Sequence, residues 1–276
     1  MLISLGTGTT FLEVTKARLL EVEIPLPPLQ TQRKIAAILS TYDDLIENNT
    51  RRIKILEDMA QTLYQEWFVH FRFPGHENVP MVESSLGLIP QGWEVKKVKE
   101  IVKRLKAGKT YRETDVDQTG KIIVIDQSRA DFLGFHDNEP DHNASPKDPI
   151  VIFGDHTCKM QLMVVPFSLG PNVVPFIAKD KMPVGYLFFL ISSLVETREY
   201  KRYWTELNNK VVAVADSETS ERFSDFTTGI FQKKEILKQR NQNLRQTRDL
   251  LLPKLISGEI GVSQLDIDTV PKVIQL

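Results

Sequence analysis

The feature that most constrains this fold is a run of mainly apolar residues whose spacings alternate between four and three. Such spacing is typical of a coiled-coil seam, whereas a helix that lies on a globular core usually shows a wider apolar stripe. Pro27 and Pro28 prevent helix formation before about Leu29. We therefore expect a helix over residues 30–71 that packs against a partner helix, with a helix on a globular core as the alternative. The seam consists of Ile35, Leu39, Tyr42, Ile46, Asn49, Ile53, Leu56, Ala60, Leu63 and Trp67.

A second helix with a similar but weaker seam is expected from about Phe223 to Leu252, where Pro253 should limit it. Shifting the first helix by 188 positions places Leu56 on Leu244. The chain therefore contains an internal helical repeat that flanks one intervening domain. Because both helices are attached to that domain, we expect them to run antiparallel.

One antiparallel register matches the two seams, namely the register in which paired residue numbers sum to 290. It pairs Ile53 with Leu237 and Asn49 with Asn241. A buried amide pair lowers stability but fixes the register of a coiled coil. We therefore predict that Asn49 and Asn241 set the register, and the alternative is that each asparagine is simply exposed to solvent.

The segment between the helices has a different pattern. Residues 72–92 are rich in proline and glycine and are expected to form a linker, and residues 93–222 show the short apolar runs of a β-rich domain. Residues 183–203 have helical spacing. The predicted fold class is α+β, with one mixed β-rich domain and two long helices that form an antiparallel coiled coil. Strands are expected at residues 122–125, 150–153, 160–165 and 173–176. The remaining segments are residues 1–29, which are too short to fold alone, the second helical segment 223–257 and a C-terminal tail 258–276.

Composition limits the class of protein. A length of 276 residues, 41% hydrophobic residues and a net charge of −1 are ordinary for a globular protein of one or two domains. Cys158 is the single cysteine, so an internal disulfide is excluded, which fits a reducing compartment. The sequence shows no signal peptide and no stretch that approaches the roughly 20 apolar residues of a membrane helix. We therefore expect a cytoplasmic protein that does not contact membranes.

Three segments resemble parts of the type I restriction–modification specificity subunits. Residues 25–35, PLPPLQTQRKI, are similar to the beginning of the central conserved helix of that family. Residues 86–94, LGLIPQGWE, are similar to the start of its target-recognition domains, and residues 243–260 to the end of its distal conserved helix. The three matches occur in the family's order and cover nearly the whole chain. The chain is therefore identified as a specificity subunit, with its target-recognition domain at residues 93–222.

The resemblance implies a DNA-binding scaffold and not an enzyme. Each target-recognition domain of such a subunit reads one half of a bipartite target in double-stranded DNA, so we expect this chain, with one such domain, to read one half. A specificity subunit also holds modification subunits, which use S-adenosylmethionine, and motor–nuclease subunits, which use ATP and Mg. No cofactor is expected on this chain itself. The alternative function is a coiled-coil interaction protein that assembles or modulates the complex without reading DNA.

The chain departs from the family in one respect. A full-length member has a target-recognition domain before each helix, but only about 29 residues precede the first helix here. Among them, residues 6–11 resemble the last strands of such a domain. The chain is then either a truncated remnant of a longer subunit or a half-subunit that forms a homodimer and reads a symmetric target.

The beginning of the β-rich domain is its most basic part. Residues 96–112 contain eight lysines and arginines and one acidic residue, Glu100. Such a cluster suits the neutralisation of phosphates, and the alternative is a solvated basic helix face. The Gly-Lys-Thr at residues 108–110 lacks the first glycine of a nucleotide-binding loop, because position 103 is a lysine. The DNA-binding residues predicted here are Lys106, Lys109, Thr110, Tyr111 and Arg112.

Two further segments, residues 126–129 and 154–161, resemble parts of a subset of these recognition domains. Glutamine can bond adenine through two atoms, arginine or lysine can bond guanine, and histidine or threonine a phosphate or base edge. The alternative for His156 is a residue that shapes a turn. Asp155 stands where an asparagine is expected, so we do not predict direct contact there. The DNA-binding residues predicted here are Gln127, Arg129, His156, Thr157, Lys159 and Gln161.

His156 and Cys158 also suggest a zinc pair or a thiol nucleophile. There is no second cysteine, and the other histidines lack the spacing of metal ligands. A Cys–His catalytic site needs an orienting partner and a lowered thiol pKa, and the sequence indicates neither. We therefore expect no catalytic residue and no metal site.

Overall fold

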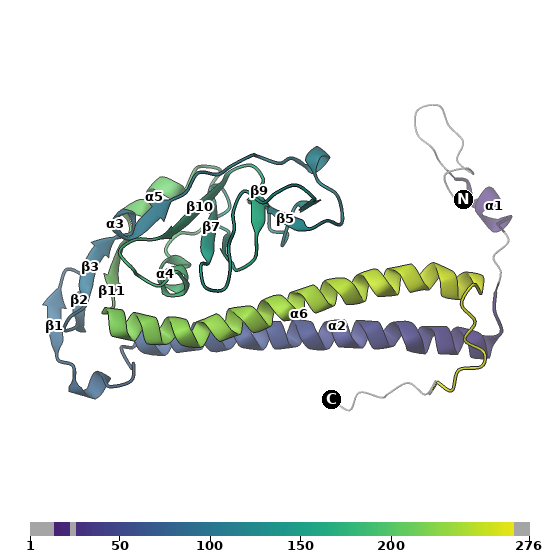
Figure 1. Ribbon diagram of the computed structural model, residues 1–276, viewed down its shortest axis with the longest axis horizontal. Helices are drawn as coiled ribbons and strands as arrows, with labels where there is room; N and C mark the ends of the chain where they lie inside the picture. Colours follow the sequence, from purple (N-terminus) through teal and green to yellow (C-terminus); the bar gives the residue numbers. More distant parts are fainter. Residues whose placement is uncertain (1–13, 23–25, 268–276) are drawn as a thin grey trace. The chain divides into compact units, whose positions relative to one another are not determined.

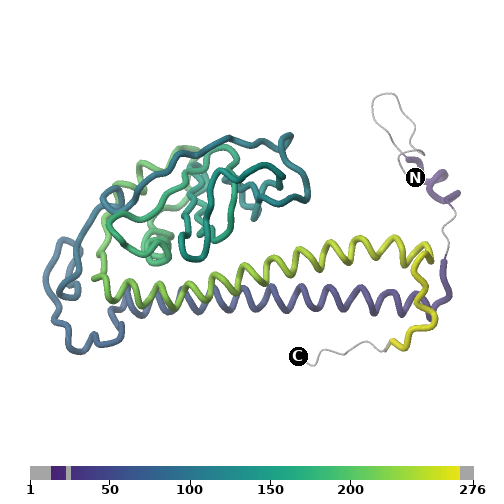
Figure 2. The backbone as a smooth tube through the Cα atoms, viewed as in Figure 1, coloured from purple at the N-terminus to yellow at the C-terminus, as the bar shows by residue number. Residues whose placement is uncertain are grey.

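The structure is a computed structural model that describes residues 14–22 and 26–267. The chain, which Figures 1 and 2 trace from end to end, divides into two compact units. We call residues 1–50 with 239–276 the helical unit and residues 51–238 the mixed unit. Each unit contains part of two long helices, α2 (Leu29–Tyr64) and α6 (Ser217–Ser257). The predicted fold class, α+β with two long paired helices, is confirmed.

Within the helical unit, α2 and α6 run side by side in opposite directions (Figure 1). Arg248 is hydrogen-bonded to Asp43, and Asn49 Nδ2 donates to Asn241 Oδ1 at 2.9 Å. Higher numbers in one helix therefore meet lower numbers in the other. Asn241 is buried, and its Nδ2 also donates to Thr50 Oγ1 at 3.2 Å. The two asparagines thus face each other in the register whose paired numbers sum to 290.

The helical unit has a small core. This core is formed by Ile35, Leu255 and Val262, against which Leu39 packs. Residues 6–11, which resemble strands of a recognition domain, lie outside the described residues. Lys16–Leu20, within the same predicted remnant, form a short helix, α1. The Thr15 side chain explains this helix, because it accepts a hydrogen bond from the Arg18 N–H at 3.4 Å and so caps the first turn.

The same pairing holds for the parts of α2 and α6 in the mixed unit. Lys234 Nζ bonds Glu57 Oε1 at 2.8 Å, and Leu237 is buried. The ring centroids of Trp67 and Phe223 are 6.1 Å apart. A π-helical turn, η2 (Gln65–Val69), extends α2 close to the predicted end at residue 71.

Helix α6 differs from its predicted bounds at both ends. It begins at Ser217 because Asp216 caps it: the Thr219 N–H donates to Asp216 Oδ1 at 2.8 Å. The sequence predicted that Pro253 would limit the helix, but Pro253 lies inside it, just before the last turn. A proline there removes only one helical hydrogen bond, and the helix ends before Gly258, whose φ of +78° is readily adopted only by glycine.

The mixed unit contains four small sheets. A four-stranded antiparallel sheet has the order β4-β10-β7-β8, and a three-stranded sheet has the order β6-β5-β9, in which β5 and β9 are parallel. β1 pairs with β2, and β11 pairs with β3. The strands are β1 (Met81–Ser84), β2 (Gly87–Pro90), β3 (Glu94–Lys97), β4 (Val102–Arg104), β5 (Ile122–Ile125), β6 (Gly134–His136), β7 (Ile150–Gly154), β8 (Met160–Met163), β9 (Phe167–Leu169), β10 (Val173–Ala178) and β11 (Val211–Val214). The short helices between them are α3 (Val98–Ile101), α4 (Val184–Ile191) and α5 (Trp204–Asn209), and η3 (His76–Asn78) and η4 (Glu113–Asp115) are 3-10 turns.

All four predicted strands are present as β5, β7, β8 and β10. Two other expectations were wrong. Residues 72–92 are not a plain linker, because β1 and β2 form a hairpin there and Phe73 and Ile89 are buried in the main core. The helix expected over residues 183–203 ends at Ile191, because the following residues form a loop that Tyr203 holds by hydrogen bonds to its backbone.

The main core of the mixed unit gathers aromatic rings from distant parts of the sequence. The centroid of the Phe68 ring lies 5.0 Å from that of Phe223 and 4.7 Å from that of Tyr186. The Tyr186 hydroxyl accepts the Ala215 N–H at 3.0 Å, and burial raises the pKa of this tyrosine. These contacts hold the N-terminal end of α6 against the core of the mixed unit. Among the helices of the described residues, none has the combination of length and apolar character that crossing a membrane requires.

Candidate nucleic-acid interface

The first predicted set lies on the loop between β4 and η4, in the mixed unit. Lys106, Lys109, Thr110 and Arg112 are exposed. Gly108 has a φ of +79°, and a Cβ there would come within 2.6 Å of Asp141, so only glycine fits this bend. The Lys109 N–H donates to Asp141 Oδ1 at 3.0 Å. The loop therefore has a fixed course and presents three cations to solvent.

Tyr111 is the exception in this set. Its side chain is only 3% exposed, and its ring stacks on His136 with a centroid distance of 4.3 Å and an interplanar angle of 1°. Its N–H donates to the Leu169 carbonyl at 2.9 Å, and Lys109 Nζ lies 4.4 Å from its ring centroid. The prediction that Tyr111 contacts DNA stays a prediction, and in this structure the neighbours of Tyr111 bury its ring. Tyr111 instead anchors the basic loop to β9 and β6.

The second predicted set gathers around the turn between β7 and β8. The His156 N–H donates to Gln127 Oε1 at 3.1 Å, and Thr157 Oγ1 donates to the Gln127 carbonyl at 2.6 Å. The turn also includes Cys158 with a φ of +54°. The structure therefore brings Gln127, His156 and Thr157 together. It also shows that Gln127 braces the turn, which leaves its Oε1 already bonded within the protein.

The two cations of this set have different surroundings. Lys159 is half-buried, and its Nζ donates to the carbonyls of Asp126, at 3.3 Å, and of Ala130. Burial lowers the pKa of Lys159. Its amine thus holds the 126–131 loop in place, whereas Arg129 on that loop is exposed. Gln161 is half-buried on β8, opposite Ile152 of β7.

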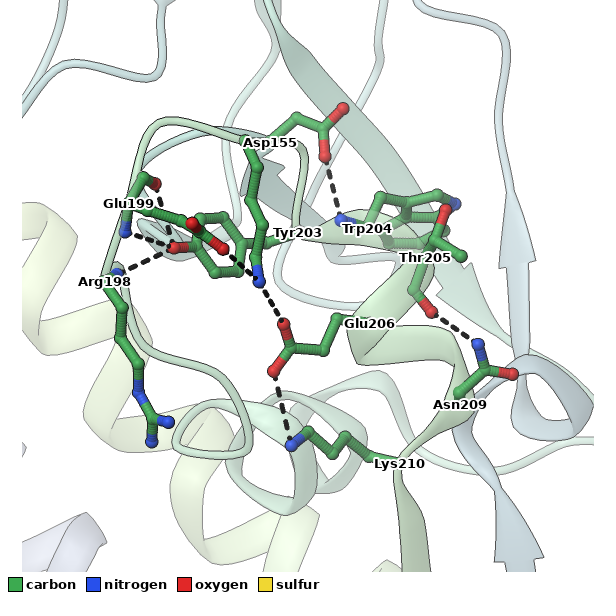
Figure 3. A network of polar contacts seen from close by, with 10 residues as sticks. Asp155, Arg198, Glu199, Tyr203, Trp204, Thr205, Glu206, Asn209 and Lys210 are labelled. Atoms are coloured by element: carbon green, nitrogen blue, oxygen red, sulfur yellow. Dashed lines mark hydrogen bonds and ion pairs between the residues drawn. The ribbon is translucent and has the colours of Figure 1, made fainter.

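The sequence did not single out the loop at residues 192–203, which lies beside this turn. The Tyr203 N–H donates to the Asp155 carbonyl at 2.7 Å, and the Trp204 N–H donates to Asp155 Oδ1 at 2.9 Å (Figure 3). Asp155 is buried and has a structural role, in line with the expectation that it makes no direct contact. On this loop, Tyr200 is 86% exposed and stacks on His156. The one signal was the charged run Arg198–Arg202, which differs from the apolar residues earlier in the segment 183–203.

The described residues give no support for a metal or thiol site. No group of three or more potential ligand side chains that could hold a metal occurs among them. Burial, as the largest effect, raises the pKa of the Cys158 thiol, whereas a cysteine nucleophile requires the opposite shift.

Comparisons with known proteins agree with the resemblance of the sequence motifs. A family model described as the type I restriction modification DNA specificity domain matches residues 1–58. The type I restriction enzyme MjaIX specificity subunit of Methanocaldococcus jannaschii is 28% identical over 287 residues, which cover 94% of this chain and 65% of the relative. The MjaVIII specificity subunit of the same organism is 34% identical over 120 residues, which cover 43% of this chain and 27% of the relative. The chain thus spans less than two thirds of the length of these relatives.

The fold also has a solved counterpart. The S subunit of a type I restriction–modification system from M. genitalium superimposes with a TM-score of 0.55 at 17% identity, over 91% of this chain and 68% of that one. Specificity subunits are the non-catalytic components of such systems, as the sequence predicted for this chain. The ordered sequence motifs, the match over residues 1–58 and these relatives all support a type I restriction–modification specificity subunit.

Proposed function

We propose that the mixed unit binds double-stranded DNA in a sequence-specific manner and reads one half of a bipartite target. The observation that carries this proposal is the fixed, exposed basic loop with Lys106, Lys109 and Arg112. An exposed basic loop is by itself a weak signal of DNA binding, but this loop lies in a chain whose residues 1–58 match a DNA specificity domain.

The two predicted sets suit different tasks. Lysines and arginines on an exposed loop neutralise phosphates and position the protein, but they carry little sequence information. Base edges are read by side chains with free donors and acceptors, and Arg129 and His156 lie at the braced β7–β8 turn or the loop beside it. Gln127 and Lys159 hold the turn and the neighbouring loop in place, since their polar groups form hydrogen bonds within the protein.

The paired helices suit a scaffold for other subunits. We propose that modification subunits, which use S-adenosylmethionine, and motor–nuclease subunits, which use ATP and Mg, assemble on them. A second function is an interaction protein that assembles or modulates the complex without reading DNA. The observation in its favour is the buried Asn49–Asn241 pair, which favours one helix pairing whether or not DNA is bound.

Fluorescence anisotropy with a labelled random-sequence duplex separates the two functions. The full chain is titrated alone and in the presence of the modification subunit. DNA reading predicts binding that weakens with salt in at least one of the two titrations. An assembly protein predicts binding to the modification subunit with no binding to the duplex in either titration, and that result would contradict our proposal.

A further inference from the structure

Tyr200 is the most exposed large hydrophobic or aromatic side chain among the described residues, at 86%. It does not extend freely from its loop, because one face of its ring is covered. The Tyr200 and His156 rings are almost parallel, with centroids 4.7 Å apart and an interplanar angle of 8°. The opposite face of the Tyr200 ring and its hydroxyl remain open to solvent.

The backbone just before Tyr200 is held by one buried tyrosine. The Tyr203 hydroxyl accepts the N–H groups of Arg198 and Glu199 at 2.7 and 2.9 Å, and donates to the Glu199 carbonyl at 2.9 Å (Figure 3). The Tyr203 ring is 1% exposed. The loop therefore keeps its course without help from a ligand.

His156 connects Tyr200 with the predicted DNA-binding residues. Its N–H is bonded to Gln127, and its Nδ1 is buried with no hydrogen-bond partner in the described part of the chain. An imidazole fixed on one side by the turn and on the other by Tyr200 has little freedom. Tyr200, His156 and Gln127 thus form one continuous, ordered surface group.

Charged side chains of both signs surround Tyr200, and Arg202 Nε lies 3.8 Å from Asp155 Oδ2. The segment Arg198–Lys210 contains four cations and two carboxylates. Lys201 bonds Glu199 at 2.9 Å and Glu206 at 3.4 Å, so both carboxylates are partnered. Glu196, at the start of the loop, is one further exposed carboxylate.

From this geometry we infer that Tyr200 contacts a DNA base through its open ring face and sets the sequence preference at one position of the target. The inference rests on the proposed DNA-reading function. An aromatic ring that is already stacked loses little conformational entropy when a base adds to the stack. Aromatic residues that partly unstack a base step are an established way for proteins to deform duplex DNA.

Selection from a duplex library with a randomised centre tests this inference with the full chain. The wild type and Tyr200→Ala are each used for selection, and their affinities for the wild-type-enriched duplex are then compared. Loss of one base stack predicts binding weaker by roughly five- to 150-fold, and a preference that disappears at one position only. Tyr200→Phe keeps the ring and should bind within about twofold of the wild type. Phe226→Ala, at an exposed aromatic residue of α6 in the same unit, is the matched control and should not change DNA binding.

Two measurements separate direct contact from an indirect effect on His156. When 5-iodouracil replaces thymine at the affected position, ultraviolet light should crosslink the duplex to the peptide that contains Tyr200. Tyr203→Phe keeps Tyr200 but frees the loop, so it should weaken binding less and speed amide exchange at Arg198 and Glu199.

Unchanged affinity and preference in Tyr200→Ala would overturn the inference. If Lys106→Ala/Lys109→Ala/Arg112→Ala still weakened binding in that case, the proposed function would stand without this contact. A wild-type chain that enriches no sequence, either alone or with the modification subunit, would overturn both.

Discussion

The Asn49–Asn241 pair offers a stringent test of how the helices are matched. Asn241 is 4% exposed, and its Oδ1 accepts a hydrogen bond from Asn49 Nδ2 at 2.9 Å. Asn49→Leu removes that donor and leaves a buried oxygen unpaired, which costs about 1–3 kcal/mol. Asn49→Leu/Asn241→Leu removes both polar groups from the seam, and such a change is often neutral or stabilising. The two substitutions should therefore be strongly non-additive.

Urea unfolding followed by circular dichroism at 222 nm measures this coupling, because the signal comes mainly from the helices. With an m-value of about 3 kcal/mol/M, a loss of 2 kcal/mol lowers the midpoint by roughly 0.7 M. We expect that shift for Asn49→Leu and a midpoint at or above that of the wild type for the double variant. If Asn49→Leu matches the wild type, or if the double variant loses the sum of the single effects, the asparagines do not face each other in a buried seam.

Other predictions follow from the mixed unit. Lys106→Ala/Lys109→Ala/Arg112→Ala should weaken duplex binding and reduce the slope of log K against log salt by roughly one for each phosphate that the loop no longer neutralises, and an unchanged slope would remove the loop from the interface. Phe223→Ala should lower the free energy of unfolding by about 3–5 kcal/mol, because the ring is fully buried among aromatic neighbours; a loss below 1 kcal/mol in urea unfolding would contradict this packing. Burial acts to raise the pKa of Glu206, but hydrogen bonds and charges from Lys201 and Lys210 lower it below 4.5. Since the folded pKa lies below the unfolded one, this carboxylate stabilises the fold above pH 4.5 and ceases to do so as the pH falls through the folded pKa. Glu206→Gln should therefore be less stable than the wild type at neutral pH only, and a difference that persists in acid would refute the assignment.

Features set by local periodicity could be predicted from the sequence. The seam of α2 is a property of neighbouring turns, and the similar seam of α6, together with one asparagine in each seam, led to the register in which Asn49 meets Asn241. The early start of α6 was also visible in principle, because Asp216 followed by Thr219 is a helix N-cap pattern.

Features that depend on distant contacts could not be predicted. Tyr111 looks like an exposed residue of a basic loop, but His136 and Leu169 bury it. The loop before α5 looked helical by spacing, but its course is set by the Tyr203 hydroxyl and by the bond from Tyr203 to Asp155. No local pattern reveals that such a loop places Tyr200 on His156. The sequence indicated which chemical groups the candidate residues carry, but it did not indicate which of these side chains are exposed to solvent.

Hydrogen–deuterium exchange of the full chain with and without duplex DNA tests most directly whether the mixed unit carries the DNA-reading surface. Our account predicts slower amide exchange at residues 105–112, 126–131 and 154–161 when duplex is bound, with no change in the β1–β2 hairpin. Protection confined to α2 and α6, or no protection at any concentration of duplex, would contradict it.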